Sequence, residues 1–327
     1  MTLCQSHMLS YCTKQIRPIK LRRFFMGLFM SKQQNLNSSL GLLLILGITW
    51  SLGYSIARYC TTNGVNPLAY AFWQSLGPAV ILTLLCFALK IPYSLKKQAL
   101  LFYVFAGLIG ISLPNANMYF AAQHLPAGIL AVVINTVPIF TYLLALAFKE
   151  ESFQRRRFAG VILTFLGLFI LSSPNVLLNA SNVPWLFTAL LTPMAFSMCA
   201  VFISKYRPDN SHSLSLAAGM LCASTLWLTP VVFMLGHYYW PGQLYLLKNQ
   251  LILIEIALSS FGYWVLFTLL KKAGAVFYSL VGGVVAIIGL FWGWLFFGET
   301  QTSLSMLAIL SIIAGITCVA IKSTNKS

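Results

Sequence analysis

Charged side chains are scarce in this sequence, and nearly all of the charge has one sign. Only 8% of the 327 residues are charged, with 21 Lys and Arg against five Asp and Glu, whereas 59% are hydrophobic. A soluble domain carries about 25% charged residues. The composition therefore excludes an ordinary soluble domain and predicts an all-α polytopic membrane protein.

Motifs for metal, redox and nucleotide chemistry are also missing. The seven cysteines form no CxxC pair, the four histidines are scattered, and no GxxxxGK[ST] loop occurs. We therefore expect no metal site, no cofactor and no ATP-driven pump of the P-loop type. The basic excess is not a nucleic-acid signal, because the basic residues cluster at the ends of apolar runs.

Apolar runs of membrane-spanning length fill most of the chain, since a spanning helix needs about 20 apolar residues. The connections between them are short, which predicts antiparallel neighbouring helices. The sequence predicts ten spans, at about 38–58, 67–89, 99–121, 125–148, 157–173, 183–203, 214–236, 250–270, 274–297 and 303–321.

The basic residues predict how these spans are oriented. With ten spans and both termini inside, 19 of the 21 Lys and Arg fall on the inner side, and only Arg58 and Lys248 fall outside. Such an excess of inner basic residues is typical of membrane proteins. We therefore predict an N-in/C-in topology. Residues 1–37 would be a basic cytoplasmic tail, and Met30 offers an alternative start that would leave the residues before it untranslated.

The pattern of an apolar run, a charged turn and a second apolar run occurs twice, 148 residues apart. This offset pairs Val133 with Val281, Glu151 with Glu299, and Gly167 with Gly315. Five spans in each copy is an odd number, so the two copies would be inverted across the membrane. We expect two inverted five-helix repeats, at 38–173 and 183–321. Inverted repeats are typical of secondary transporters, whose substrate site lies near mid-membrane between the halves.

Several motifs resemble the EamA-type transporters of the drug/metabolite transporter (DMT) superfamily, over about residues 38–321. Two departures concern residues that bear on substrate charge: Gln74 stands where many members carry Arg, and Ala286 stands where the first repeat has Pro138. The resemblance rests on Ile48-Thr49-Trp50-Ser51, on Ala127, Pro138, Glu151, Gly160 and Gly167, and on Ala275, Gly298, Glu299 and Gly315.

This resemblance implies a bacterial inner-membrane protein rather than an enzyme. Its expected activity is secondary active transport of small organic metabolites by alternating access. The expected mode is efflux of amino-acid-like or drug-like compounds, coupled to protons or working by exchange. The expected partners are a small-molecule substrate, the lipid bilayer and, as an open alternative, a second copy in a homodimer.

Three other functions fit the sequence less well. A nucleotide-sugar or phosphate-ester exchanger should place Lys or Arg at membrane depth, whereas here the basic residues stay at span ends. A membrane-embedded transferase should carry clustered His, Asp or Glu, and no such cluster is visible. A receptor or scaffold would need larger loops.

Glu255 is the only acidic residue inside a predicted span. A carboxylate at the bilayer centre costs about 2.5–3.5 kcal/mol on insertion scales, so such residues mark functional sites. Facing a central cavity, Glu255 would bind a cation or take up a proton during coupling. The alternative is that it lies near the outer interface, seven residues after Lys248, and extends its carboxylate to water.

Polar and aromatic side chains at membrane depth are candidates for the wall of a substrate cavity. Amides there must find a partner in a neighbouring helix or in cavity water, and both roles stay open for Asn117 and Asn135. Aromatic walls with a few amides suit a neutral or zwitterionic organic substrate. The cavity candidates are Trp50, Gln74, Asn117, Asn135 and Tyr263.

Small residues and one carboxylate are assigned structural roles. Gly282, Ala286, Gly289 and Gly293 form a stripe on the ninth span, which predicts close helix packing. Glu299 follows that span and is expected to stabilise the N-terminus of the next helix, because a carboxylate there favours the positive end of the helix dipole.

Overall fold

The structure is a computed structural model that describes residues 36–134, 136–149, 152–171, 180–208, 211–278, 281–300 and 302–320. Its compact unit begins at Ser39, and within the described residues it contains helices and no strand. The helices are α2 (Leu36–Thr62), α3 (Pro67–Ala88), α4 (Lys97–Gly107), the π-helical turn η1 (Leu108–Ser112), α5 (Leu113–Ala122), α6 (Ala127–Ile134), α7 (Val137–Ala147), α8 (Arg155–Leu171), the 3₁₀ turn η2 (Ala180–Asn182), α10 (Val183–Ala189), α11 (Leu191–Tyr206), α12 (Ser213–Met234), α13 (Leu247–Tyr278), α14 (Val281–Phe297) and α15 (Ser303–Ala320).

Helix length and apolar composition identify a multi-pass membrane protein. Seven helical segments among the described residues are long and apolar enough to cross a bilayer, and two shorter apolar helices cover Val281–Phe297 and Ser303–Val319. Helix α8 adds a segment of 17 residues. The count of ten spans stays a prediction, since three of these segments are shorter than a typical span.

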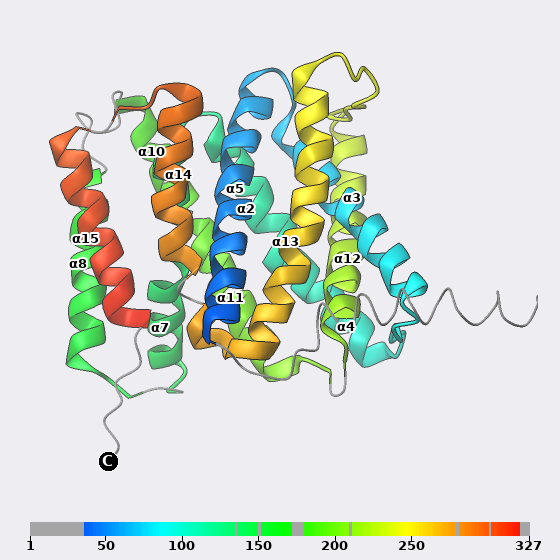
Figure 1. The fold of residues 1–327 in the computed structure, drawn as a ribbon, viewed down its shortest axis with the longest axis horizontal. Helices are drawn as coiled ribbons and strands as arrows, with labels where there is room; N and C mark the ends of the chain where they lie inside the picture. Colours follow the sequence, from blue (N-terminus) through cyan, green and yellow to red (C-terminus); the bar gives the residue numbers. More distant parts are fainter. Residues whose placement is uncertain are drawn as a thin grey trace, which may run out of the picture. The chain divides into compact units, whose positions relative to one another are not determined.

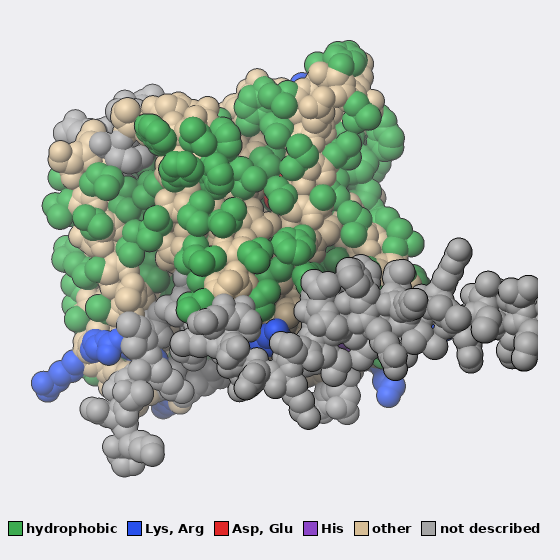
Figure 2. Space-filling view, in the orientation of Figure 1, with side chains coloured by type: hydrophobic (Ala, Val, Ile, Leu, Met, Phe, Trp, Pro, Cys, Tyr) green, Lys and Arg blue, Asp and Glu red, His purple; other side chains and the backbone are tan. Residues whose placement is uncertain are grey.

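The helices of the compact unit stand side by side (Figure 1), with α8 and α15 at one edge and α3, α4 and α12 at the other. Helix α2 begins and α15 ends at the same end of the bundle (Figure 1). Apolar side chains cover the face shown in Figure 2, and most of its Lys and Arg gather toward that end. We call it the basic end, and we call the opposite end, where α2 finishes, the Thr62 end.

Prolines interrupt two of the spans. The span from 127 to 147 consists of α6 and α7, with Thr136 in a turn and Pro138 in the first turn of α7. Proline lacks a backbone N–H and clashes with the preceding helical turn, so a helix start accommodates it at the least cost. Membrane helices also tolerate proline in their interiors, as α3 does with Pro78 and α12 with Pro230. The span from 97 to 122 is likewise divided by η1, after which Pro114 opens α5.

One predicted boundary is wrong. The sequence predicts a break at 271–273, where Lys271 and Lys272 suggest a membrane surface, but α13 continues through both lysines to Tyr278. Lysine is a good helix former, so two lysines do not end a helix, although they can mark where it leaves the bilayer. Asn135, Glu151 and nearly all of the predicted tail at 1–37 lie outside the described residues.

Candidate functional site

Glu255 lies inside the bundle rather than at its surface. It is the ninth residue of α13, about 12 Å along the helix from Leu247, and its exposed fraction is 7%. A Cβ added to Gly53 of α2 would lie 2.7 Å from the Glu255 Oε1. A glycine at that position therefore lets α2 pack directly against the carboxylate, and the geometry does not fit a side chain that extends to the interface.

Ser259, one helical turn after Glu255, joins the carboxylate to α3. Its hydroxyl lies 3.0 Å from the Glu255 Oε1 and 3.0 Å from the Gln74 Oε1. A serine hydroxyl has a single proton to donate. It therefore cannot satisfy both oxygens when Glu255 is ionised and Gln74 keeps this orientation.

Two arrangements of protons resolve this conflict. If Glu255 is protonated, its O–H donates to Ser259, which donates to the Gln74 carbonyl. If Glu255 is ionised, Ser259 donates to the carboxylate, and a rotated Gln74 amide donates to Ser259. The two amide orientations differ only in which atom is O and which is N. The chain Glu255–Ser259–Gln74 can thus accept or release one proton by exchanging hydrogen-bond direction.

Three buried polar atoms around this chain have no hydrogen-bond partner among the described residues: the Glu255 Oε2, the Gln74 Nε2 and the Tyr70 hydroxyl. Gln74 and Tyr70 are 2% and 0% exposed. Buried polar groups in native proteins are nearly always paired, and an unpaired one costs about 1–3 kcal/mol. Together these atoms offer an acceptor and donors to a bound molecule.

Aromatic rings surround the polar chain. Tyr70 and Tyr119 pack edge to face with ring centroids 4.6 Å apart, and Tyr70 lies one helical turn before Gln74 on α3. Tyr263 follows Ser259 by one turn of α13, so both side chains lie on one face of the helix. Trp50 lies against α13, since a Cβ added to Gly262 would be 2.9 Å from its indole Nε1. Four of the predicted site residues thus lie around one region where α2, α3 and α13 meet: Trp50, Gln74, Glu255 and Tyr263.

No described basic residue forms an ion pair with Glu255, whereas Arg58 pairs with Glu299. No group of three or more His, Cys, Asp and Glu side chains that could hold a metal ion occurs in the part of the chain that the structure describes. A buried carboxylate without a counter-ion is stable only if it is protonated or if a ligand supplies the positive charge.

Asn117 is engaged elsewhere. Its side-chain N–H groups donate to the Thr188 carbonyl at 2.7 Å and to the Thr192 hydroxyl at 2.9 Å. Both donors therefore tie α5 to α10 and α11. This geometry favours the interhelical hydrogen bond over a role in the substrate cavity.

The stripe of small residues on α14 is buried, and it faces α6. A Cβ added to Gly289 would lie 2.5 Å from the Ala131 Cβ, and one added to Gly293 would lie 3.2 Å from the backbone nitrogen of Gly128. Gly282 and Ala286 are buried on the same helix. The stripe lets helices from the two sequence repeats approach closely.

Glu299, which the sequence predicts to stabilise the helix that follows it, hydrogen-bonds to the start of α6, 171 residues earlier. Its Oε1 and Oε2 accept hydrogen bonds from the backbone N–H groups of Ala127 at 2.8 Å and Gly128 at 3.1 Å, at the start of α6. Helix α15 is capped instead by the Thr302 hydroxyl, which accepts from the Ser305 N–H at 3.2 Å. The start of α6 can bind this carboxylate because its first N–H groups also lack intrahelical partners.

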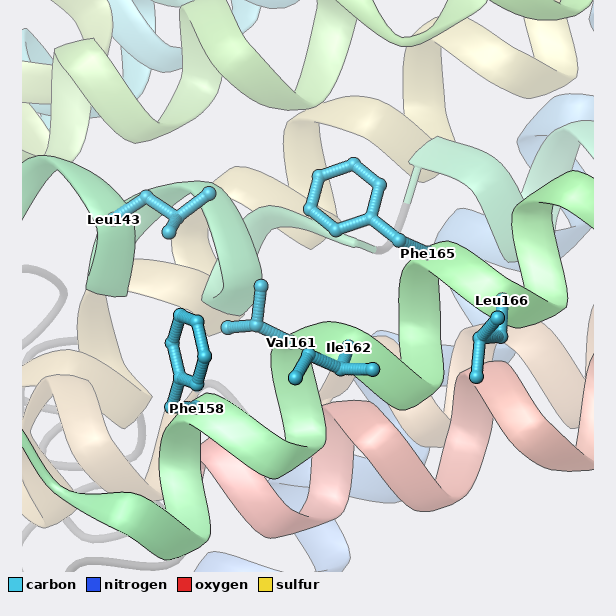
Figure 3. A pocket seen from close by; sticks show the side chains of 6 residues that line it. All are labelled: Leu143, Phe158, Val161, Ile162, Phe165 and Leu166. Atoms are coloured by element: carbon cyan, nitrogen blue, oxygen red, sulfur yellow. The ribbon is translucent and has the colours of Figure 1, made fainter.

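An apolar groove of about 460 Å³ lies between α7 and α8 (Figure 3). It is lined entirely by apolar side chains, of which Phe158, Phe165 and Leu166 are exposed on the outside of the bundle. Without a polar group to orient a ligand it does not resemble a substrate site, and we assign it to the lipid-facing surface. Its lining residues are Leu143, Phe158, Val161, Ile162, Phe165 and Leu166.

Sequence reasoning missed Ser259 and Tyr70. The signal for Ser259 was its spacing, because a residue four positions after Glu255 lies on the same helical face. Tyr70 offered no comparable signal, since its position depends on how α3 packs against α13.

Known proteins resemble this chain over most of its length. Residues 37–173 and 183–321 match the EamA-like transporter family. An uncharacterized transporter of Archaeoglobus fulgidus is 24% identical over 185 residues, which make up 55% of this chain and 64% of the relative, so the match spans less than two thirds of that protein. The uncharacterized inner membrane transporter YedA of Escherichia coli is 26% identical over 294 residues, covering 86% of this chain and 90% of YedA. A protein of known crystal structure shares the fold with a TM-score of 0.57 at 14% identity, covering 84% of this chain and 95% of the other.

Proposed function

Because the chain belongs to the EamA-like transporter family, and is thus a membrane transporter of the drug/metabolite type, we propose that it is a secondary active transporter that works by alternating access. Its cargo is a small organic metabolite, amino-acid-like or drug-like, which it exports across the bacterial inner membrane. The YedA relative, named as an inner membrane transporter, supports this location.

The proposed topology has ten spans in two inverted repeats, with both termini in the cytoplasm. Three observations support it. The family match occurs in two segments of similar length, and the start of α2 and the end of α15 lie at the same end of the bundle (Figure 1). In addition, 19 of the 21 basic residues fall on the inner side of such a topology. On this proposal the basic end faces the cytoplasm and the Thr62 end faces outward.

The half-paired carboxylate of Glu255 is the observation that carries the mechanism. In one state Glu255 is protonated and donates through Ser259 to Gln74. In the other it is ionised and its free Oε2 binds the positive group of a substrate, while tyrosine rings cover the apolar part. Because proton and substrate would use one carboxylate, the two cannot bind together, and export of one accompanies import of the other.

The site favours this cargo over a phosphate ester. A phosphate group would require Lys or Arg at the site, and the polar groups described around Glu255 are a carboxylate, amides and hydroxyls. A transferase is disfavoured as well, since both matched segments belong to a transporter family.

The test is transport in everted vesicles or proteoliposomes, using a panel of amino acids and organic amines with and without a pH gradient. We expect the wild type to move at least one amine-containing compound faster with the gradient. Glu255→Gln should lose that response and keep, at most, gradient-independent exchange. A correctly folded wild type that moves nothing in the panel under either condition would refute the proposal.

A further inference from the structure

The carboxylate of Glu299 joins three separate parts of the chain at the Thr62 end. It accepts two backbone hydrogen bonds from the start of α6 and pairs with Arg58 of α2, and it follows directly on α14. The Arg58 guanidinium also lies over the Phe297 ring, 4.9 Å from its centroid. We call this group of Arg58, Glu299, Phe297 and the α6 N-terminus the carboxylate latch.

Both charges of the latch are largely removed from solvent. The side chains of Arg58 and Glu299 are 24% and 9% exposed. Hydrogen bonds to a charged partner are stronger than neutral ones, and the first N–H groups of a helix form an anion-binding site because they lack intrahelical partners. An opening of the helices at this point must therefore break several charge-assisted interactions at once.

The latch connects the two repeats rather than parts of one repeat. Arg58 and the α6 N-terminus belong to the first matched segment, 37–173, whereas Glu299 belongs to the second, 183–321. Gly128 and Gly293 permit the close approach below the carboxylate, because a Cβ on either glycine would contact Glu299 or the opposite helix. The carboxylate latch thus lies at the interface between the two repeats. The repeats must separate along this interface to expose a site between them.

We propose that the carboxylate latch is the outer gate of the transporter: paired, it closes the path from the Thr62 end to Glu255, and its release opens that path. This inference rests on the proposed alternating-access function. Arg58 and Glu299 are gating residues, since neither is part of the Glu255–Ser259–Gln74 chain. The expectation that Glu299 has only a local helix-capping role does not explain its pairing with Arg58 across the repeat interface.

Cys60 supplies a native reporter of the gate. It lies two residues after Arg58, it is fully buried, and its thiol is 3.5 Å from the Lys248 carbonyl at the start of α13. Gly53, where an added Cβ would contact Glu255, lies seven residues earlier on the same face of α2. Cys60 therefore lies between the Thr62 end and the proposed site, where water should reach it only when the gate is open.

The experiment measures labelling of Cys60 by a membrane-impermeant maleimide in right-side-out vesicles. Cys60 is kept as the only cysteine, and Cys4, Cys12, Cys86, Cys199, Cys222 and Cys318 are replaced by serine or alanine. Against this background we compare Glu299→Gln and Arg58→Gln with Thr302→Ala. The control variant removes the cap of α15 three residues from Glu299 without touching the latch.

We expect Glu299→Gln to speed labelling by about tenfold or more, because that is the population shift from losing one strong charged pair. Arg58→Gln keeps the cap on α6 and should give a smaller increase, which also tests the gate if Glu299→Gln fails to fold. Thr302→Ala should label as slowly as the parent.

Three outcomes would overturn the gate: unchanged labelling in both latch variants, equal acceleration in Thr302→Ala, or acceleration only for reagent applied from the basic end. The readout does not require a known substrate, so the two proposals fail separately. Normal transport with unchanged labelling overturns the gate alone, whereas faster labelling in vesicles that transport nothing overturns the transport function.

Discussion

Glu255 and Glu299 are the two acidic residues in the described part of the chain, and their carboxylates are satisfied in opposite ways. Both oxygens of Glu299 accept backbone hydrogen bonds, and an arginine supplies the counter-charge. Glu255 shares one serine proton with Gln74, leaves its Oε2 unpaired, and has no counter-ion among the described residues.

The difference separates a structural carboxylate from a chemical one. A fully paired carboxylate gains nothing from a proton or a ligand, so its energetic effect is to hold its partners together. A half-paired carboxylate in a low-dielectric interior is costly until something binds to it. The amides repeat this contrast, because Asn117 uses both donors on neighbouring helices whereas the Gln74 Nε2 has no described partner.

Removing the charge of Glu255 should have the largest effect on transport. Glu255→Gln keeps the shape but cannot exchange a proton, so we expect the stimulation of transport by a pH gradient to fall by about 5–150-fold, the usual range of a coupling free energy. Vesicle flux with an imposed gradient measures it. Should the variant keep full stimulation, the contrast between the two carboxylates has no mechanistic meaning.

Breaking the hydrogen-bond chain at Ser259 should have a smaller effect. Ser259→Ala removes one hydrogen bond, worth about 1 kcal/mol, so transport should fall about fivefold and its dependence on pH should change. The neighbouring Ser260 is the control, since its hydroxyl donates only to the Ile256 carbonyl of its own helix at 2.7 Å. Equal pH profiles for Ser259→Ala and Ser260→Ala would mean that no proton passes through Ser259.

Substitutions near Glu299 should change helix packing, and with it the stability of the protein, rather than proton binding. Gly293→Ala would bring a Cβ to 3.1 Å from the Glu299 Cδ and 3.2 Å from the Gly128 nitrogen, and we expect a loss of about 1–3 kcal/mol in stability. Gly283→Ala on the same helix has nothing within 4 Å and should be neutral or stabilising by up to about 1 kcal/mol. Melting temperatures in detergent compare them, and equal values for the two variants would contradict a close α6–α14 contact.

Asn117→Ala should give the smallest effect. An interhelical hydrogen bond in a membrane is worth about 0.6 kcal/mol on average, so we expect a slight loss of stability with unchanged substrate preference. The measurement pairs a melting curve with competition between two transported compounds. A changed preference at unchanged stability would return Asn117 to the substrate cavity.

Composition and charge predict the coarse architecture well, because a bilayer restricts a chain to a few solutions. The all-helical polytopic fold and the family are confirmed, and the inverted ten-span topology stays a prediction. The individual contacts could not be predicted from the sequence, for physical reasons. The partner of Glu299 lies 171 residues away, and a free helix N-terminus attracts a carboxylate from any part of the chain. The end of α13 was misjudged because charge marks a membrane surface and not a helix boundary.

The site was predictable in part for the same reason. A lone acidic residue in an apolar span can be recognised from the sequence, and so can aromatic residues at a similar depth. Which carboxylate oxygen of Glu255 is hydrogen-bonded depends on how α2 and α3 pack against α13. Gly53 and Gly262 contribute to this packing. Asn117 was a candidate on composition alone, and only the positions of α10 and α11 reveal that its donors are occupied.

The π-helical turn η1 sets the rotational register of everything after it in that span. A π turn holds one residue more than an α turn, so Leu108–Ser112 turns α5 about its axis relative to α4. Deleting one residue there would rotate α5 by about 100°. Asn117 would then leave Thr188 of α10 and Thr192 of α11. A single additional residue in this turn thus determines which helices the Asn117 amide faces in the membrane interior.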